Sequence, residues 1–356
     1  MKKLDLTKNT GLLIGSRPED YVLGANSPIP LEARNLKRDW REFRSRPERQ
    51  NYIEFDATNC TSHTITNLWE STANWMLVNN LWPEDALKFW NTNEYIVNGK
   101  FEISERFLTK MSGNTRQGNY FYKVFDCIRK DGVVPENRWF YQVGMNWDNF
   151  YAEPAEEIKL LGRESLKYFN LLYESIPAIN PKYAVDLLFK GLEHSPIAIG
   201  IGTCSPWDES VPACGMSPNH AVLLDHIEDK AFNIFDSYDP VSKTLEAGYP
   251  IYTAYKGILY PIKRNEPIVK SETLEKDITF GEISDEVLRV RSALNRLGWK
   301  NLVGWNVYDS ELADVVWKYQ LANLSWSLFW ETVMFLKGRR VGPATRKSIN
   351  NALKFR

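Results

Sequence analysis

A thiol, an imidazole and a carboxylate in this chain have the types and surroundings needed for nucleophilic chemistry. Cys60 follows the turn-rich stretch 56–59 and stands where a long helix is expected to begin. A helix N-terminus stabilises negative charge, which favours the thiolate, the nucleophilic form of cysteine. Most free cysteines, however, are small buried hydrophobes, so Cys60 alone does not establish a nucleophile.

A cysteine nucleophile needs a base within hydrogen-bond reach and a third group that orients the base. His220 opens the apolar run HAVLLDHI, and Asp236 ends the next run, FNIFD. If the turn EDKA joins these runs as neighbouring antiparallel strands, the two side chains meet. Taken singly, His220 also reads as a structural histidine and Asp236 as a turn residue, but their order and placement favour a joint site with Cys60.

The elements that would position these residues are helical first and extended later. Near-helical spacing of Ile65, Leu68, Trp75 and Met76 predicts a helix with one buried face. Residues 154–193 read as charged amphipathic helices. From Pro196 onward, short apolar runs lie between Gly, Pro and Asp, as is typical of strands. Helices followed by a sheet predict an α+β domain.

Composition narrows the class of protein. The 44 Lys and Arg residues nearly balance the 45 Asp and Glu residues, so no global field points to nucleic acid. No run of eighteen apolar residues predicts a membrane span, and the N-terminal stretch lacks the apolar region of a Sec signal peptide.

The length of the chain and its Pro-, Gly- and charge-rich stretches predict four segments. Residues 1–45 read as an N-terminal arm, 46–262 as the α+β domain, 263–283 as a linker, and 284–356 as a small helical domain. The arm is either a pro-piece or an ordinary surface wrap.

The four cysteines form no CxxC pair, and no HxH or HExxH spacing supports a metal reading of Asp225 and His226. We therefore expect no metal and no cofactor. Cys204 and Cys214 flank a loop and could form a disulfide in an oxidising compartment or remain reduced.

Many short matches in the right order make residues 46–262 similar to a papain-like cysteine peptidase. ISERFLTKMSGN resembles the family's LSEQ-L stretch, and FDCIRKDGVVPENRWFY resembles its segment ending in YPY. NHAVLLDHI resembles NHAVLLVGY, and FNIFDSYDP falls where the family's asparagine-containing strand is expected. Glu70 matches a glutamate common on the helix of the nucleophile. The resemblance implies a papain-like fold with a helical half and an antiparallel sheet half.

The resemblance implies that Cys60 is the nucleophile, His220 the general base and acid, and Asp236 the group that orients His220, in place of the family's asparagine. The oxyanion-hole glutamine is expected six residues before the cysteine, where this chain has Glu54, whose charge would repel an oxyanion. Gln50 could serve instead if the intervening loop is longer.

Two substrate-binding positions and one rival alignment follow from the same resemblance. Gly118 falls near the family's substrate-binding glycines, and Asn219 precedes the histidine as a second substrate contact. The rival alignment sets His63 at the position of the nucleophile, which would make the site inactive.

The C-terminal segment resembles a peptidoglycan-binding domain of three helices. The matching stretches are DEVLRVRSALNRLGW, ADVVWKYQLAN and RRVGPATRKSINNAL, with an aromatic insert between the second and third. The resemblance implies a small all-α domain that binds bacterial cell wall.

Together the two resemblances imply a cysteine peptidase directed to peptidoglycan, such as a phage lysin or a virion-associated wall hydrolase. With no Sec signal peptide expected, such a protein would act outside the cytoplasm after lysis or in a virion, and otherwise in the cytoplasm. Two alternatives remain: a peptidase that acts on a protein, for example in virion maturation, and an inactive wall-binding protein on the same scaffold.

Overall fold

The computed structural model describes residues 11–15, 34–51, 55–176, 181–213, 215–262, 274–297, 299, 307–324 and 337–354. The chain divides into two compact units, the first ending at Pro261 and the second beginning at Ile262. Among the described helices, none is long and apolar enough to cross a bilayer.

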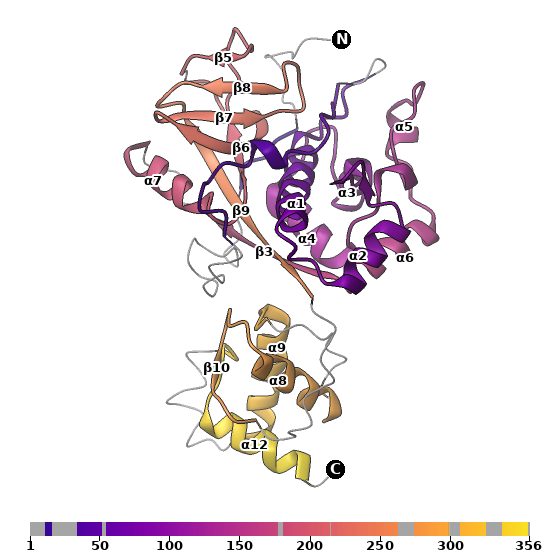
Figure 1. The fold of residues 1–356 in the computed structure, drawn as a ribbon, viewed down its shortest axis with the longest axis vertical. Coiled ribbons are helices and arrows are strands. Elements are labelled where there is room, and N and C mark those ends of the chain that lie inside the picture. Colours follow the sequence, from indigo (N-terminus) through magenta and orange to yellow (C-terminus); the bar gives the residue numbers. More distant parts are fainter. Residues whose placement is uncertain are drawn as a thin grey trace. The chain divides into compact units, whose positions relative to one another are not determined.

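The first unit places a helical half beside a sheet half, with α1 between them (Figure 1). The helices of this unit are α1 (Cys60–Val78), α2 (Glu84–Thr92), α3 (Glu105–Met111), α4 (Phe121–Asp131), α5 (Trp147–Phe150), α6 (Glu156–Ser165) and α7 (Pro181–Gly191). Short 3-10 helices span Arg41–Phe43 and Glu136–Arg138, and β1 (Ile96–Val97) pairs with β2 (Lys100–Phe101).

Seven strands form the main sheet in the order β3-β9-β4-β6-β7-β8-β5. They are β3 (Phe169–Ser175), β4 (Ile197–Ile201), β5 (Ser210–Val211), β6 (His220–Glu228), β7 (Ala231–Phe235), β8 (Ser242–Leu245) and β9 (Ile251–Pro261). All neighbours are antiparallel except β5 and β8, which are parallel. The predicted α+β class, with a helical half and a sheet half, is confirmed.

The predicted helix around α1 is buried more completely than its spacing indicated. Every residue from Cys60 to Met76 is buried, not one face only. Its polar side chains bond crossing segments: Asn74 accepts from the Phe101 N–H at 2.7 Å, and Glu70 accepts from the Ile103 N–H at 2.6 Å. These bonds satisfy groups that would otherwise be costly to bury.

The helical prediction for residues 154–193 is wrong at its centre. Residues 169–175 form β3, which pairs antiparallel with β9 along its whole length. Phe169, Leu171 and Tyr173 are buried there, and a ladder partner overrides the weak helical preference of the local sequence.

The second unit contains, in its described part, α8 (Asp285–Arg296), α9 (Ser310–Asn323), α12 (Pro343–Lys354) and a two-stranded ladder of β10 (Ile278–Thr279) and β11 (Arg340–Val341). Leu274 and Ile278 lie in its apolar core with Val290, Val316 and Val341. The aromatic insert at 325–336 lies outside the described residues, and the assignment as a wall-binding domain stays a prediction.

Candidate active site

Cys60 is the first residue of α1 and is fully buried. Its Sγ accepts a hydrogen bond from the backbone N–H of Ala221 at 3.3 Å. Ala221 directly follows His220, so this bond places the thiol beside the start of β6. The first-turn N–H groups of α1 and the Ala221 N–H provide a setting that stabilises negative charge on sulfur.

His220 and Asp236 meet as the strand argument predicts. β6 and β7 are antiparallel neighbours, with Leu223 opposite Phe235. The His220 Nε2 lies 2.7 Å from the Asp236 Oδ1, and both side chains are buried. The predicted hairpin is confirmed, and the structure brings Cys60, His220 and Asp236 together; their catalytic roles stay a prediction.

Asp236 has two further partners that sequence reasoning missed. Trp207 Nε1 donates to its Oδ2 at 2.9 Å, and Lys243 Nζ donates to the same oxygen at 2.8 Å. Burial alone would raise the pKa of Asp236, but the charges and hydrogen bonds of His220 and Lys243 hold it well below its usual range. Asp236 is therefore ionised at neutral pH.

Gln50 reaches the site because a loop intervenes between it and Cys60. Asn51 and Asp56 form an antiparallel bridge, and the Ala57 N–H donates to the Gln50 carbonyl at 3.0 Å. Gln50 itself is buried, its Oε1 accepts from Ser237 at 2.9 Å, and its Nε2 donates to Asp56 at 3.0 Å. The bridge closes the loop and brings Gln50 next to the residue that follows Asp236. Glu54 lies in residues 52–54, outside those described.

Aromatic rings flank the His220 imidazole. The Trp207 and Tyr238 ring centroids lie 5.8 and 5.4 Å from that of His220, both edge-on. The Tyr238 hydroxyl donates to Asp56, and burial raises the Tyr238 pKa, so the phenol stays protonated. Trp207 in CSPWDES and Tyr238 in DSYDP carry no helical or strand pattern, which is why sequence reasoning passed over them.

Gly118 lies against a segment of the chain's own N-terminal arm. Asn119 pairs in parallel with Leu12: the Leu13 N–H donates to the Asn119 carbonyl at 2.8 Å, and the Asn119 N–H donates to the Gly11 carbonyl at 2.9 Å. Gly118 has φ +97°, and a Cβ there would meet Gly11 backbone atoms at 2.2 Å. The backbone at 118–119 thus holds an extended peptide, formed here by residues 11–13.

This segment also lies against the two residues that precede Cys60. A Cβ at Gly11 would lie 2.0 Å from the Thr58 carbonyl oxygen and 3.0 Å from the backbone nitrogen of Asn59, the residue before Cys60. Leu12 is buried, and a Cβ at Gly200 on β4 would meet its side chain at 2.7 Å. Residues 11–12 therefore lie between the backbone beside Cys60 and the sheet.

The other predicted residues have more ordinary surroundings. Asn219 bonds Thr203, whose N–H donates to its Oδ1 at 3.0 Å, so its side chain braces the loop after β4. His63 lies in α1, one turn after Cys60, and burial lowers its pKa. Cys60, and not His63, accepts the Ala221 N–H, which favours the first alignment over the rival one.

Two other cysteines differ from Cys60. Cys127 is a buried free thiol in α4 whose pKa is raised by burial, so it is unreactive. Cys204 is disulfide-bonded, and Cys214 lies outside the described residues.

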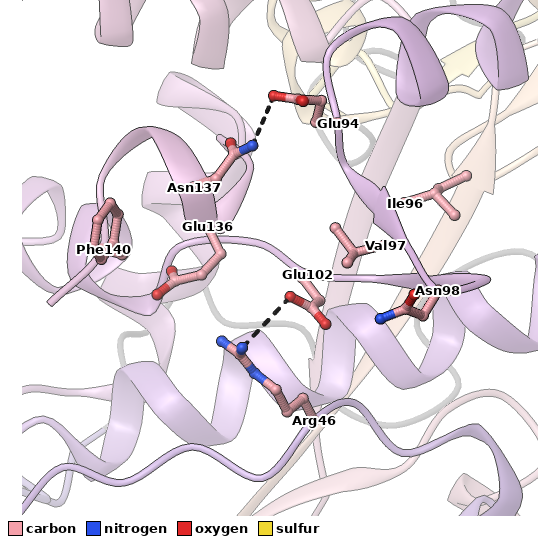
Figure 2. Close-up of a pocket in the computed structure, with 9 residues that line it drawn as sticks. All are labelled: Arg46, Glu94, Ile96, Val97, Asn98, Glu102, Glu136, Asn137 and Phe140. Carbon is pink, nitrogen blue, oxygen red and sulfur yellow. Dashed lines mark hydrogen bonds and ion pairs between the residues drawn. The ribbon is translucent and has the colours of Figure 1, made fainter.

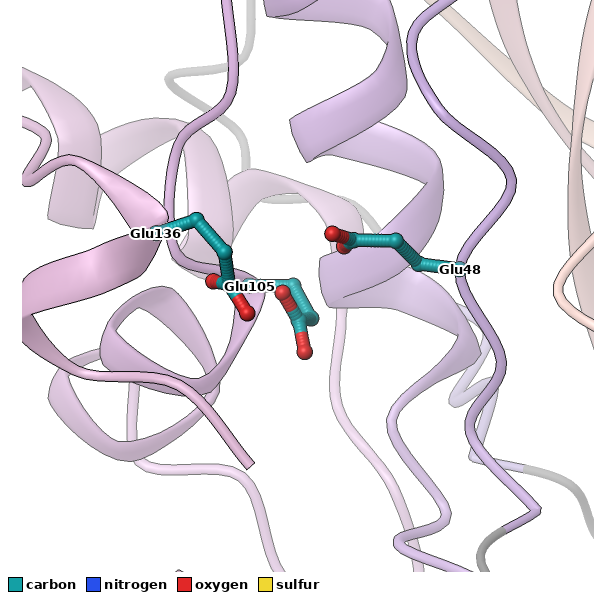
Figure 3. A group of neighbouring side chains, drawn as sticks. All are labelled: Glu48, Glu105 and Glu136. Carbon is teal, nitrogen blue, oxygen red and sulfur yellow. The ribbon is translucent and has the colours of Figure 1, made fainter. Parts of the chain in front are cut away.

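An acidic cluster lies apart from this site in the helical half. Carboxylate oxygens of Glu48, Glu105 and Glu136 lie within 4.8 Å of one another (Figure 3). Burial and neighbouring carboxyls raise the pKa of Glu48 and of Glu136, so both keep their protons to a higher pH than exposed glutamates do. This raised affinity for protons eases the close approach of the carboxyl groups, and we assign no metal to the cluster.

Glu136 also lines a pocket of about 630 Å³ that shares no residue with the Cys60 site (Figure 2). Its wall includes an ion pair between Arg46 and Glu102 at 3.9 Å and a hydrogen bond from Asn137 to Glu94 at 2.7 Å. The pairing of these charges leaves the pocket without a clear ligand preference.

Comparison with known proteins finds likeness at the level of structure alone. No family model and no curated protein matches the chain. Xylellain, a cysteine protease from Xylella fastidiosa, is 14% identical, with a TM-score of 0.47 over 74% of this chain and 100% of that one. The bromelain protease from Ananas comosus, solved with the inhibitor E64, is 15% identical, with a TM-score of 0.40 over 63% and 96%. The ragweed allergen Amb a 11, a cysteine protease in its proform, is 16% identical, with a TM-score of 0.40 over 68% and 72%.

Proposed function

We propose that this chain is a cysteine peptidase whose nucleophile is Cys60, whose base and acid is His220, and whose orienting group is Asp236. Two buried contacts support the proposal: the Cys60 thiol accepts the backbone N–H of Ala221, the residue after His220, and His220 contacts Asp236 at 2.7 Å. A thiol activated by an imidazole that a carboxylate orients is an arrangement suited to acyl transfer.

The reaction follows from these positions. The Cys60 thiolate attacks the carbonyl carbon of a peptide bond, and the tetrahedral oxyanion is stabilised by the Cys60 N–H and the Gln50 side-chain amide. His220, protonated, gives its proton to the leaving amine as the C–N bond breaks and a thioester forms. Water then attacks the thioester while His220 accepts its proton, and the acid product leaves as the thiolate is restored.

In this proposal, the peptide substrate pairs with the backbone at Gly118 and Asn119. Its N–H and carbonyl groups pair with residues 11–13 in the structure, which supports the binding of an extended peptide there. A substrate has to displace residues 11–13 to occupy the same backbone groups. The arm thus limits access to the site, and Asn219 contributes to substrate binding through the loop that it braces.

Labelling with an epoxide thiol reagent, read by mass spectrometry of Cys60, tests the site. We expect wild type and Cys127→Ala to be labelled at Cys60, and His220→Ala to lose most of the labelling. Equal labelling of wild type and His220→Ala would refute an activated thiol and favour the inactive scaffold.

We further propose that the substrate is a stem or cross-bridge peptide of peptidoglycan, reached after lysis or from a virion. This rests on the sequence resemblance of residues 284–356 to a wall-binding domain. Mass spectrometry of sacculus digests by wild type and Cys60→Ala tests it, because only the former should release peptides. Cleavage of casein without release from sacculi would instead indicate a protein substrate.

A further inference from the structure

Lys243 is a buried lysine beside Asp236, the carboxylate that the proposed site uses to orient His220. It lies on β8 and exposes only 2% of its surface. Lysine is rarely buried this completely unless its charge is paired, because the ammonium group loses its hydration. In the sequence it stands in the run VSKTL, where Val241 and Leu245, two positions to either side, share its face of the strand.

The ammonium group has acceptors for all three of its N–H bonds. It donates to the Asp236 Oδ2 and to the Tyr238 carbonyl, each at 2.8 Å, and to the Pro240 carbonyl. It also lies 5.3 Å from the centre of the Trp207 ring. Lys243 is thus held in one position by the turn that follows Asp236.

The two oxygens of Asp236 have separate partners. Oδ1 contacts His220, whereas Oδ2 accepts from both Trp207 and Lys243. The pair of donors on Oδ2 fixes the plane of the carboxylate, and this plane fixes the direction in which Oδ1 meets the imidazole. A charge-assisted bond contributes more to such positioning than a neutral one.

We propose that Lys243 is a positioning residue of the peptidase site: it orients Asp236 and offsets part of its charge, and so sets the pH at which the His220 ring loses its proton. The inference rests on the proposed function. A lone carboxylate would hold the imidazolium proton more strongly, which hinders its transfer to the leaving amine. Asp236 paired with Lys243 still holds the His220 ring in place, but it stabilises the imidazolium less than an unpaired carboxylate would.

The other charged groups near Lys243 and Asp236 are unchanged between wild type and a variant of Lys243 alone. Among the described residues, the titratable and charged groups around it include His220, Cys60, His63, Asp56, Tyr238 and the ion pair of Asp239 with Arg49. Because none of them is altered when Lys243 alone is changed, a change in the titration of His220 reports the loss of the ammonium charge.

The experiment uses the full chain labelled with ¹³C at the histidine rings. The chain has only four histidines, so the His220 signal is assigned by comparison with His220→Ala. In Lys243→Met we expect the pH at which the ring loses its proton to rise by about one unit, since a charge a few ångströms away acts on this scale. The alkaline limb of the pH profile of kcat/KM should move to higher pH by a similar amount.

Lys256→Met is the matched control. Lys256 is also a buried lysine, 4% exposed, and it pairs with Glu174 at 3.0 Å on β9 and β3. Its loss removes a buried charge and lowers stability, but should leave the His220 titration unchanged. If Lys243→Met does not fold, Lys243→Gln replaces it, because glutamine keeps an N–H donor without the charge.

A double variant provides a second, independent readout. Asp236→Asn leaves the Lys243 ammonium buried without its anion, so we expect a large fall in Tm. Asp236→Asn with Lys243→Met removes both charges and should melt at a higher temperature than Asp236→Asn alone. If the double variant is no more stable, the pairing of Lys243 with Asp236 is refuted.

The outcomes separate the two proposals. Peptidase activity in wild type with an unchanged His220 titration in Lys243→Met overturns only the role of Lys243, even if Tm falls. A shifted titration in a chain that cleaves no peptide and is not labelled at Cys60 overturns the proposed function and retains the action of Lys243 on the Asp236–His220 pair.

Discussion

Replacing Leu12 by alanine should make the proposed peptidase more active. Leu12 is 2% exposed and packs near Gly200, while the backbone on either side of it pairs with Asn119. Residues 11–13 occupy the backbone groups that a peptide substrate would use. Weaker packing of Leu12 increases the fraction of molecules in which the site is open.

The size of the effect follows from the burial of this side chain. Full burial of a leucine contributes about 1.5–3 kcal/mol, and alanine retains about one methyl group, near 0.8 kcal/mol. The closed state therefore loses about 1–2 kcal/mol, which corresponds to an increase of about 5- to 30-fold in the open fraction. The two backbone hydrogen bonds remain, so Leu12→Ala loosens the segment without removing it.

The assay is hydrolysis of a fluorogenic peptide, with enzyme concentration set by titration of the Cys60 thiol. Ile14→Ala is the matched control, because Ile14 is 43% exposed and its truncation removes little packing. We expect kcat/KM to rise in Leu12→Ala and to change less than twofold in Ile14→Ala. No rise in Leu12→Ala, in a chain that wild-type assays show to be active, would refute the idea that residues 11–13 restrict access.

Three further predictions concern burial and charge in the first unit. Burial raises the pKa of Asp225 from 3.8 to about 6 despite its ion pair with Arg44, so its folded form favours the proton. The stability that protonated Asp225 contributes is present below pH 4 and is lost as pH rises through about 6. The free energy of unfolding should fall by at most about 3 kcal/mol over this range, and the accompanying fall in Tm should be smaller in Asp225→Asn. Burial and neighbouring carboxyls raise the pKa of Glu136, so its stabilising proton is lost as pH rises, and the Tm of Glu136→Gln relative to wild type should increase with pH. Trp207→Phe removes one hydrogen bond to Asp236, about 0.5–1.5 kcal/mol, and should lower the free energy of unfolding by about that amount and kcat/KM by about two- to tenfold.

The parts of the site that lie on regular elements could be predicted from the sequence. Apolar spacing after Cys60 predicted a helix, and α1 begins at Cys60. The apolar runs on either side of EDKA predicted two antiparallel strands, and β6 and β7 pair in that way. Because a hairpin fixes which residues are neighbours, the approach of His220 to Asp236 followed from local pattern.

The parts that depend on loops and on long-range burial could not be predicted. Gln50 comes near Asp236 only because the bridge between Asn51 and Asp56 closes a loop, and apolar spacing carries no information on such a bridge. The polar side chains of α1 read as a solvent-facing surface, although segments distant in sequence cover them. Lys243 shares its strand face with Val241 and Leu245, but nothing in the sequence shows that the turn after Asp236 supplies acceptors for a buried ammonium group.

The site joins the two halves of the first unit through backbone groups as well as side chains. Cys60 comes from the helical half, whereas its N–H donor, Ala221, comes from the sheet half. Gln50 bonds both Asp56, just before α1, and Ser237, just after Asp236. Because Cys60 and Gln50 bond residues of the sheet half, where His220 and Asp236 both lie, a small shift between α1 and β6 would separate the thiol from the imidazole. Burial of every residue from Cys60 to Met76 opposes such a shift. The hydrogen bonds that Asn74 and Glu70 accept from the backbone of Phe101 and Ile103 fix α1 within the helical half, and so fix the position from which Cys60 meets the sheet.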